Sequence, residues 1–237
     1  MENQNNYELV PVLGVTLDAV SVPRAVEISQ GYVNNDYFNF ILLAGAQLAL
    51  ESQESEETQK FVKNADLVLP GDHNIEKAIA MNNDGHYLED YLDSLFSYMA
   101  KNKKKVCVLC ESEELCQKAR TYLEYDYPGM IVRTAVYDKN GEEAMEAMVN
   151  KINGFFPDLV VPVVPLDKQK KLLLDHIETL GTNLYISSER LSTQLFMDVA
   201  DEKDESNIVK WIKKRLKLGS EGISTEFWQK FDEDVSE

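Results

Sequence analysis

The chain has 237 residues, of which 44% are apolar and 9% aromatic, enough to bury the core of one large domain and too many for a disordered protein. Its formal net charge of −17 disfavours nucleic acid and anionic lipid as partners of the molecule as a whole. It has no run of about 18 apolar residues and no basic amino terminus before an apolar stretch, so we expect a cytoplasmic protein with neither a membrane span nor a secretory signal.

Short apolar runs alternate with helical patterns along most of the chain. The predicted strands are residues 10–15, 38–43, 66–69, 105–109, 130–136, 159–164 and 183–186. The predicted helices are residues 22–33, with Ser21 as cap, 54–64, 75–81, 88–100, 113–123, 142–152 and 168–180. This alternation predicts an α/β fold, a Rossmann-like three-layer sandwich with a central mostly parallel sheet of six or seven strands. We assign residues 1–197 to it and residues 198–237 to a charged helical C-terminal appendage.

Two features near the middle of the chain have simple interpretations. The basic stretch Lys101–Lys105 is either a domain linker or, as we expect, a solvated loop. The chain has three cysteines, too few for a disulfide framework, and Cys107 and Cys110 belong to the apolar run of a predicted strand. A zinc site would need a second pair of ligands, so we expect buried thiols, no metal and no cofactor.

The segment Pro70-Gly71-Asp72-His73 follows the predicted strand 66–69 and places a carboxylate and an imidazole on one turn. In α/β proteins, ligands bind at the carboxyl ends of the strands. Asp72 is also well suited to cap the helix predicted at 75–81, and His73 has the alternative of an exposed turn residue. Both interpretations of the turn stay open from the sequence.

Several short motifs share their order and spacing with one protein family. They are Leu13-Gly14-Val15-Thr16-Leu17-Asp18, Leu67-Val68-Leu69-Pro70, Tyr127-Pro128-Gly129, Ile152-Asn153, Pro157-Asp158-Leu159 and Asp167-Lys168-Gln169-Lys170. Over about residues 8 to 187 the chain resembles the WecG/TagA/CpsF glycosyltransferases. Members of that family transfer a sugar, commonly N-acetylmannosamine from its UDP form, to a polyprenyl-diphosphate-linked saccharide in cell-wall or surface-polysaccharide synthesis. Their fold is α/β, with a C-terminal appendage that assists at the membrane.

The resemblance implies a set of site residues. Asp72 stands one position from the family's catalytic Asp and would take the proton of the acceptor hydroxyl, with His73 as a second acid–base group. The substrate-binding residues would be Gly45, Gln47, Gly71, Asp167 and Gln169. We expect Asp72 and Asp167 at the carboxyl edge of the sheet on adjoining loops, with a UDP-sugar as the small-molecule partner.

The departures from the family pattern fall where chemistry is expected. The turn Leu43–Ala46 lacks the family's Thr and Asn, and Gly71-Asp72 reverses its Asp-Gly order. Cys110–Glu114 carries three glutamates where the family has glycines, so a diphosphate would meet carboxylates; these are also ordinary residues for the first turn of a helix. Lys170 reverses the charge of a family Glu, and we expect it to be solvated.

The C-terminal region carries charges in blocks. Residues 207–218 form a predicted basic helix, with Trp211 as an anchor, between acidic segments. Such a helix could pack on its own domain, bind a protein partner or contact an anionic membrane peripherally. Within a Debye length of about 8 Å the flanking carboxylates would cancel much of the attraction to lipid.

Two functional classes follow. The first, which we favour, is a degenerate family relative that binds a protein partner of polysaccharide assembly. The alternative is an active transferase that moves a sugar from a UDP-sugar to a polyprenyl-diphosphate-linked acceptor. Fold alone does not decide between them, because function depends on the site.

Overall fold

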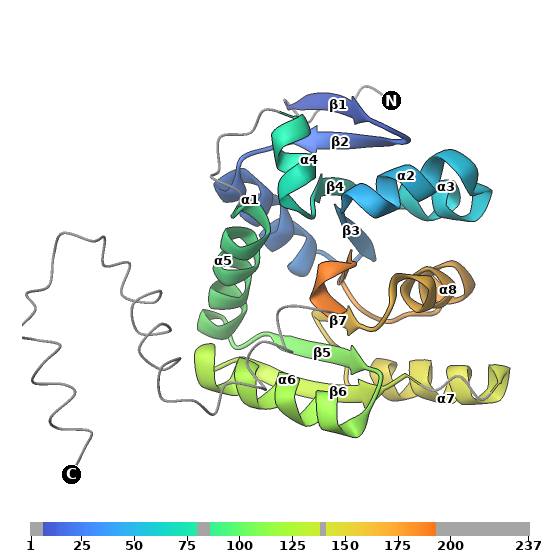
Figure 1. The fold of residues 1–237 in the computed structure, drawn as a ribbon. Helices are drawn as coiled ribbons and strands as arrows, with labels where there is room; N and C mark the ends of the chain where they lie inside the picture. Colours follow the sequence, from blue (N-terminus) through green and yellow to red (C-terminus); the bar gives the residue numbers. More distant parts are fainter. Residues whose placement is uncertain (1–6, 80–85, 138–140, 193–237) are drawn as a thin grey trace, which may run out of the picture. The chain divides into compact units, whose positions relative to one another are not determined.

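A parallel sheet forms the centre of the fold in a computed structural model that describes residues 7–79, 86–137 and 141–192 (Figure 1). Its strands are β3 (Asn39–Ala44), β4 (Leu67–Pro70), β5 (Lys105–Cys110), β6 (Ile131–Val136), β7 (Leu159–Val163) and β8 (Leu184–Ser188). They lie in the order β4-β3-β8-β7-β5-β6, and every neighbouring pair is parallel. This sheet confirms the predicted α/β architecture. Its strands are continuous apolar runs because a parallel sheet is buried on both faces.

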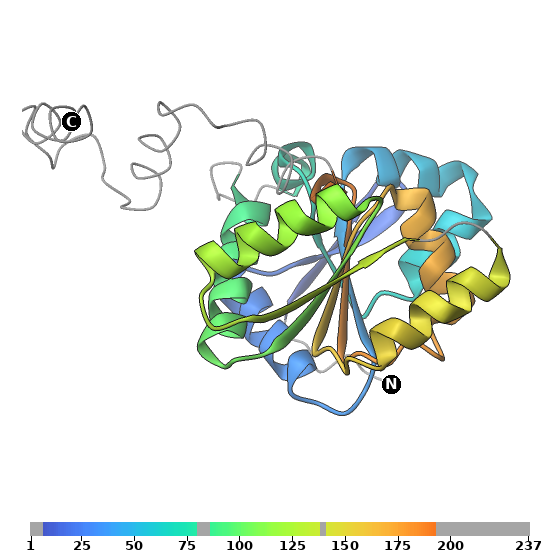
Figure 2. The ribbon, with the colours of Figure 1, turned by 90° about the horizontal axis from the view of Figure 1, so that it is seen from below.

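Helices cover both faces of this sheet (Figure 2). On one face lie α1 (Val22–Val33), α5 (Tyr87–Lys101) and α6 (Glu113–Asp126); on the other lie α2 (Ala46–Glu54), α3 (Glu56–Lys63), α7 (Glu142–Asn153) and α8 (Leu166–His176). The short helix α4 (His73–Ala78) follows β4, and a 3₁₀ turn (Arg190–Ser192) follows β8. The handedness of the crossovers explains why the helices divide between the two faces. A right-handed connection to a strand nearer β4 passes over one face of the sheet, and a right-handed connection to a strand nearer β6 passes over the other.

An antiparallel hairpin at the start of the chain corrects one prediction. Residues 10–15 were predicted as one strand, but β1 (Glu8–Val12) and β2 (Val15–Ala19) pair across a two-residue turn, Leu13-Gly14. Leu13 has φ 52°, a left-handed conformation that a leucine adopts at a cost and that the sequence pattern therefore did not predict. The hairpin is fastened to β4, because the Asp18 carboxylate accepts a hydrogen bond of 2.7 Å from the backbone N–H of Val68.

The helices also depart from prediction in two places. The helix predicted at 54–64 is α3 alone, and α2, which was not predicted, precedes it. Ser55 separates the two, because its hydroxyl accepts a hydrogen bond from the N–H of Thr58 and starts a new helix. Ser21 occupies the predicted N-cap position of α1, but its side chain makes no capping hydrogen bond.

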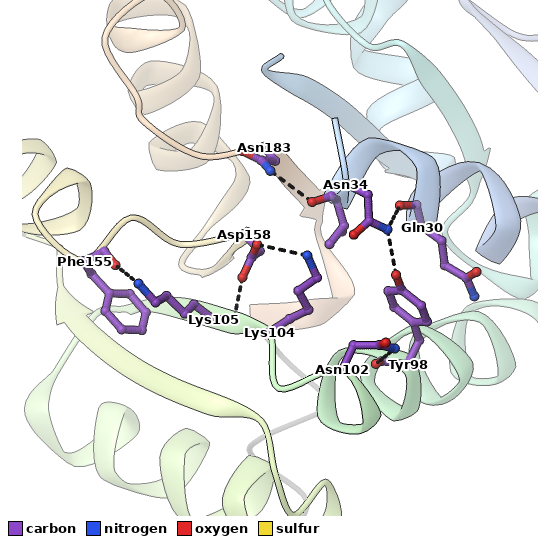
Figure 3. Close-up of polar contacts among 10 residues, drawn as sticks. Gln30, Asn34, Tyr98, Asn102, Lys104, Lys105, Phe155, Asp158 and Asn183 are labelled. Atoms are coloured by element: carbon purple, nitrogen blue, oxygen red, sulfur yellow. Dashed lines mark hydrogen bonds and ion pairs between the residues drawn. The ribbon is translucent and has the colours of Figure 1, made fainter. Parts of the chain in front are cut away.

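Polar side chains fasten the amino edge of the sheet (Figure 3). The carboxylate of Asp158 accepts hydrogen bonds from the N–H of Lys105 at 2.7 Å and from the ammonium of Lys104 at 3.4 Å. The ammonium of Lys105 in turn donates to the carbonyl of Phe155. The stretch Lys101–Lys105 therefore joins α5 directly to β5 within one sheet, and the alternative of a domain linker is wrong.

Other motifs at this edge are structural as well. The Tyr127 hydroxyl donates to the Asp93 carboxylate at 3.0 Å, and Gly129 adopts φ 107° close to the carbonyl of Ala100. The Asn153 side chain donates to the carbonyl of Thr179 and accepts from the N–H of Gly181. These residues serve the fold, far from the carboxyl edge where ligands of α/β proteins bind.

The cysteines are buried and free, as expected. Burial raises the pKa of Cys107 to about 12, which keeps the thiol protonated. Over residues 7–79, 86–137 and 141–192 there is no cluster of His, Cys, Asp or Glu side chains able to hold a metal ion.

The same residues include no helix long and apolar enough to cross a membrane. The predicted domain boundary after residue 197 and the basic segment 207–218 lie outside the described residues.

Candidate functional site

The carboxyl edge of the sheet gathers most of the predicted site residues. Asp72 follows β4, Gly45 follows β3, and Asp167 and Gln169 lie on α8, which follows β7. Asp72 and Asp167 therefore share one edge, as predicted, but β3 and β8 separate their strands, so their loops do not adjoin. A topological switch point lies between β5 and β7, because α6 and α8 leave toward opposite faces.

Asp72 holds two helices at once. Its Oδ1 accepts a hydrogen bond of 2.9 Å from the N–H of Ile75, which makes it the N-cap of α4. Its Oδ2 accepts a hydrogen bond of 2.7 Å from the N–H of Ala46, the first residue of α2. The capping interpretation is thus confirmed, and both oxygens of the carboxylate are bound by backbone.

The two glycines at this edge are required by space. A Cβ on Gly71 would lie 2.4 Å from the carbonyl oxygen of Leu43. A Cβ on Gly45 would lie 2.8 Å from the Glu189 carboxylate and 3.1 Å from that of Asp72. Both glycines therefore let neighbouring groups approach closely, and at Gly45 these groups are two carboxylates.

Glu189 is a candidate site residue that the sequence interpretation missed. It directly follows β8, and its half-buried carboxylate accepts a hydrogen bond from the N–H of Leu48 in α2. Burial raises the pKa of Glu189, and the nearby charges of Glu51 and Asp72 raise it further, against the opposing Leu48 hydrogen bond. The available signal was position: an acidic residue at the carboxyl end of a strand in the middle of the sheet.

Gln169 lies at the predicted place but is fully enclosed. Its side chain is buried, and its amide donates to the carbonyls of Val164 and Ser188. Its carbonyl oxygen accepts from the Ser187 hydroxyl and the Ser188 N–H. Three of these hydrogen bonds hold the end of β8 against α8, and the fourth joins Gln169 to the residue after β7. Together they leave the amide little capacity for a ligand.

Lys170 is buried, so the expectation that it is solvated was wrong. Its ammonium forms an ion pair with the Glu51 carboxylate of α2 and donates to the Thr58 hydroxyl of α3 at 3.1 Å. The hydrogen bond from Lys170 lowers the pKa of Glu51. The positive charge at this position thus ties three helices together on one face of the sheet.

The loop after β5 presents carboxylates, as predicted. Ser112 caps α6 through a hydrogen bond from the N–H of Leu115, and Glu113 and Glu114 occupy the exposed first turn. Glu111 forms an ion pair with Lys168 across the switch point. The remaining predicted groups, His73, Gln47 and Asp167, have exposed side chains.

A comparison with known families gives one match over most of the chain. The model of the glycosyl transferase WecG/TagA/CpsF family matches residues 10–189, a range that includes all six strands of the sheet and every candidate site residue described above. No curated protein matches the chain.

Proposed function

Since this chain belongs to the glycosyltransferase WecG/TagA/CpsF family, we propose that it is a degenerate member linked to cell-wall or surface-polysaccharide synthesis. In this proposal it no longer carries out standard sugar transfer and acts by binding a protein partner of polysaccharide assembly. The observation that carries the proposal is the pair of carboxylates, Asp72 and Glu189, that occupies the amino terminus of α2.

A diphosphate is commonly bound by the free N–H groups at a helix amino terminus. In α2 the N–H of Ala46 donates to Asp72 and the N–H of Leu48 donates to Glu189. An arriving diphosphate would lose these donors and meet negative charge. One pair of like charges at about 4 Å repels by roughly 4 kcal/mol at an effective dielectric constant near 20, more than the ~0.3 to 1 kcal/mol that a helix terminus typically returns.

The amino terminus of α6, which lies at the switch point, is also unfavourable for phosphate. Glu113 and Glu114 lie in the first turn of α6, and Glu111 precedes them. Lys168 is paired there with Glu111, and Lys118 is paired with Glu114. The amino termini of α2 and α6 thus both lie beside acidic side chains.

The candidate catalytic and binding side chains, Asp72 and Gln169, are also occupied by hydrogen bonds within the fold. A general base must be within hydrogen-bond reach of the proton that it abstracts. The Asp72 carboxylate is oriented by backbone N–H groups on both oxygens, and the Gln169 amide is used inside the fold. These contacts support a structural use of residues at positions where the active family has chemistry.

One observation favours the alternative of an active transferase. The carboxylates of Glu189 and Asp72 both approach the position that a Cβ of Gly45 would take, and burial raises the pKa of Glu189. A carboxyl group with a raised pKa next to a second carboxylate is typical of acid–base sites. In this alternative, Glu189 and Asp72 would act on a UDP-sugar and a polyprenyl-diphosphate-linked acceptor.

Thermal unfolding in the presence of UDP and of UDP-N-acetylmannosamine tests the proposal. A ligand at about 100 times its Kd stabilises a folded protein by about 2.7 kcal/mol, so binding would be visible as a raised midpoint. We expect no shift for the wild type. We expect a shift for the triple variant Glu111→Gln, Glu113→Gln, Glu114→Gln, in which Lys168 is released from its ion pair.

A clear shift of the wild type by UDP, removed by Asp72→Asn, would contradict the proposal and support the active transferase. The binding role is tested separately by sedimentation of the full chain with an active family member from the same organism. A complex is expected, and sedimentation of both proteins as separate species would reject that partner.

A further inference from the structure

A hollow of about 330 Å³ lies at the amino edge of the sheet, the edge opposite to Asp72. The segments that precede β3, β7 and β8 form it. Its lining includes Asp36, Tyr37, Phe156, Asp158, Leu180 and Thr182. The volume is at the lower end of the range of small-molecule sites, and the proposed function makes no use of it.

Two aromatic side chains of this hollow are largely exposed. The exposed fraction is 75% for Tyr37 and 76% for Phe156, the highest values among the large apolar side chains of the described residues. Phe156 also adopts φ 54°, in the turn just after α7, where glycine is the usual residue. The ring of Phe156 is not buried in the core, and its backbone conformation disfavours a phenylalanine. Contact with a ligand would give this ring a role.

The charges around the hollow nearly cancel. The Asp158 carboxylate is bound by the ammonium of Lys104 and the N–H of Lys105, as Figure 3 shows. The carboxylate of Asp36 is exposed, and in the described part of the chain it makes no hydrogen bond or ion pair. An anion would be repelled by Asp36, and a cation would be repelled by Lys104 and Lys105 at the start of β5. An uncharged ligand fits this balance best.

We infer that this hollow binds a neutral saccharide. The C–H face of a pyranose ring would pack on Tyr37 and Phe156, and Asp36 would accept hydrogen bonds from its hydroxyl groups. Flat aromatic rings supply apolar contact at little conformational cost, and a carboxylate is a strong acceptor for hydroxyl donors. This inference goes beyond the proposed function, because it concerns a second site at the opposite edge of the sheet.

Saturation-transfer difference NMR and titration calorimetry on the full chain test the inference, with N,N′-diacetylchitobiose and maltose as probes. We expect at least one disaccharide to bind with a Kd of about 1 mM. Tyr37→Ala and Phe156→Gly are each expected to weaken binding about tenfold, as loss of one stacked ring would. Phe156→Tyr keeps the ring and should keep the affinity.

Phe156→Gly also separates binding from folding. Glycine relieves the left-handed backbone, so the variant should lose affinity without a lower thermal midpoint. Tyr125→Ala, which removes an exposed aromatic ring from α6, is the matched control and should bind as the wild type does. Binding of UDP at the carboxyl edge is measured independently, so either result can fail alone.

The inference is rejected if neither disaccharide binds, or if binding is unchanged in both Tyr37→Ala and Phe156→Gly. It is also rejected if an oligolysine peptide binds in place of the sugars with the same dependence on Tyr37. That outcome would identify the hollow as a site for cations on aromatic rings.

Discussion

The ammonium of Lys170 and the carboxylate of Glu51 form an ion pair in which only the lysine is buried, with side-chain exposures of 8% and 38%. Removing the glutamate therefore leaves a buried charge, whereas removing the lysine leaves a partly exposed one. A buried charge without a partner is costly, whereas a partly exposed carboxylate can turn to water.

Substitutions at this pair should have unequal effects. Glu51→Gln removes the negative charge beside the buried ammonium, leaves it uncharged acceptors such as the Thr58 hydroxyl, and should lower the free energy of unfolding by about 3 kcal/mol. Lys170→Met replaces the ammonium by an apolar group of similar length and should cost about 1 kcal/mol. Urea unfolding of both variants measures this. Equal losses, or a larger loss for Lys170→Met, would show that the lysine is not the dominant buried charge.

The same pair should contribute to pH dependence. The pKa of Glu51 is lowered in the folded protein, so its contribution to stability is present above the ordinary value of 4.5 and is lost as pH falls through the folded value. The difference in unfolding free energy between wild type and Glu51→Gln should therefore shrink in acid. A difference that stays constant from neutral pH into this acidic range would argue against the pair as its source.

Glu189 should show the opposite sign. Its pKa is raised in the folded protein, so stability falls as pH rises from 4.5 through the folded value, and the ionised group is a cost at neutral pH. Glu189→Gln is uncharged and can still accept from Leu48, so the variant should be more stable than the wild type at pH 7. Thermal scans across this pH range should show the gain vanish in acid; a variant less stable at pH 7 would refute the assignment.

We expect Asp72 to contribute to the stability of the fold, independently of any activity. Asp72→Ala removes the caps of α2 and α4 together and should cost about 2 kcal/mol. Asp72→Asn retains one acceptor oxygen and should cost less. Hydrogen exchange at the first turns of both helices is the diagnostic measurement, and unchanged protection in Asp72→Ala would mean that water replaces the carboxylate without loss.

Gly129 should tolerate no side chain. At φ 107°, a Cβ would lie 2.9 Å from the carbonyl oxygen of Ala100, so Gly129→Ala should destabilise the protein by about 2 kcal/mol. Gly31 in α1 is the matched control, because a Cβ there meets no atom within 4 Å. Gly31→Ala should stabilise by up to about 1 kcal/mol. Equal effects of the two substitutions on the urea midpoint would refute this reading.

The fold could be predicted where apolar periodicity and packing agree. The bounds of α1 and of the strands from β3 to β8 came within two residues, because buried strands and an amphipathic helix leave a strong pattern. The hairpin could not be predicted in the same way, since Leu13 adopts a conformation that leucine rarely takes. Tertiary contacts hold that turn, and a local pattern does not contain them.

The candidate site was harder to predict than the fold for a related reason. Asp72 was found from its turn, but its second partner, Ala46, comes from a neighbouring strand connection that was not predicted to be helical. Lys170 was assigned to solvent because lysines on helices usually are, and its burial depends on Glu51 and Thr58. Glu189 carries no motif, and only the central position of β8 brings it to α2.

The central position of β8 also sets the order in which the protein can fold. Asn39 at the start of β3 contacts Asn183, 144 positions later, and β8 lies between β3 and β7. Before β8 arrives, the β4-β3 pair and the β7-β5-β6 group are separate, and β3 and β7 each expose a strand edge. Closing the sheet therefore waits for a late and distant segment, which slows folding. A chain interrupted before residue 184 would carry two further open edges, at β3 and β7, that are prone to aggregation.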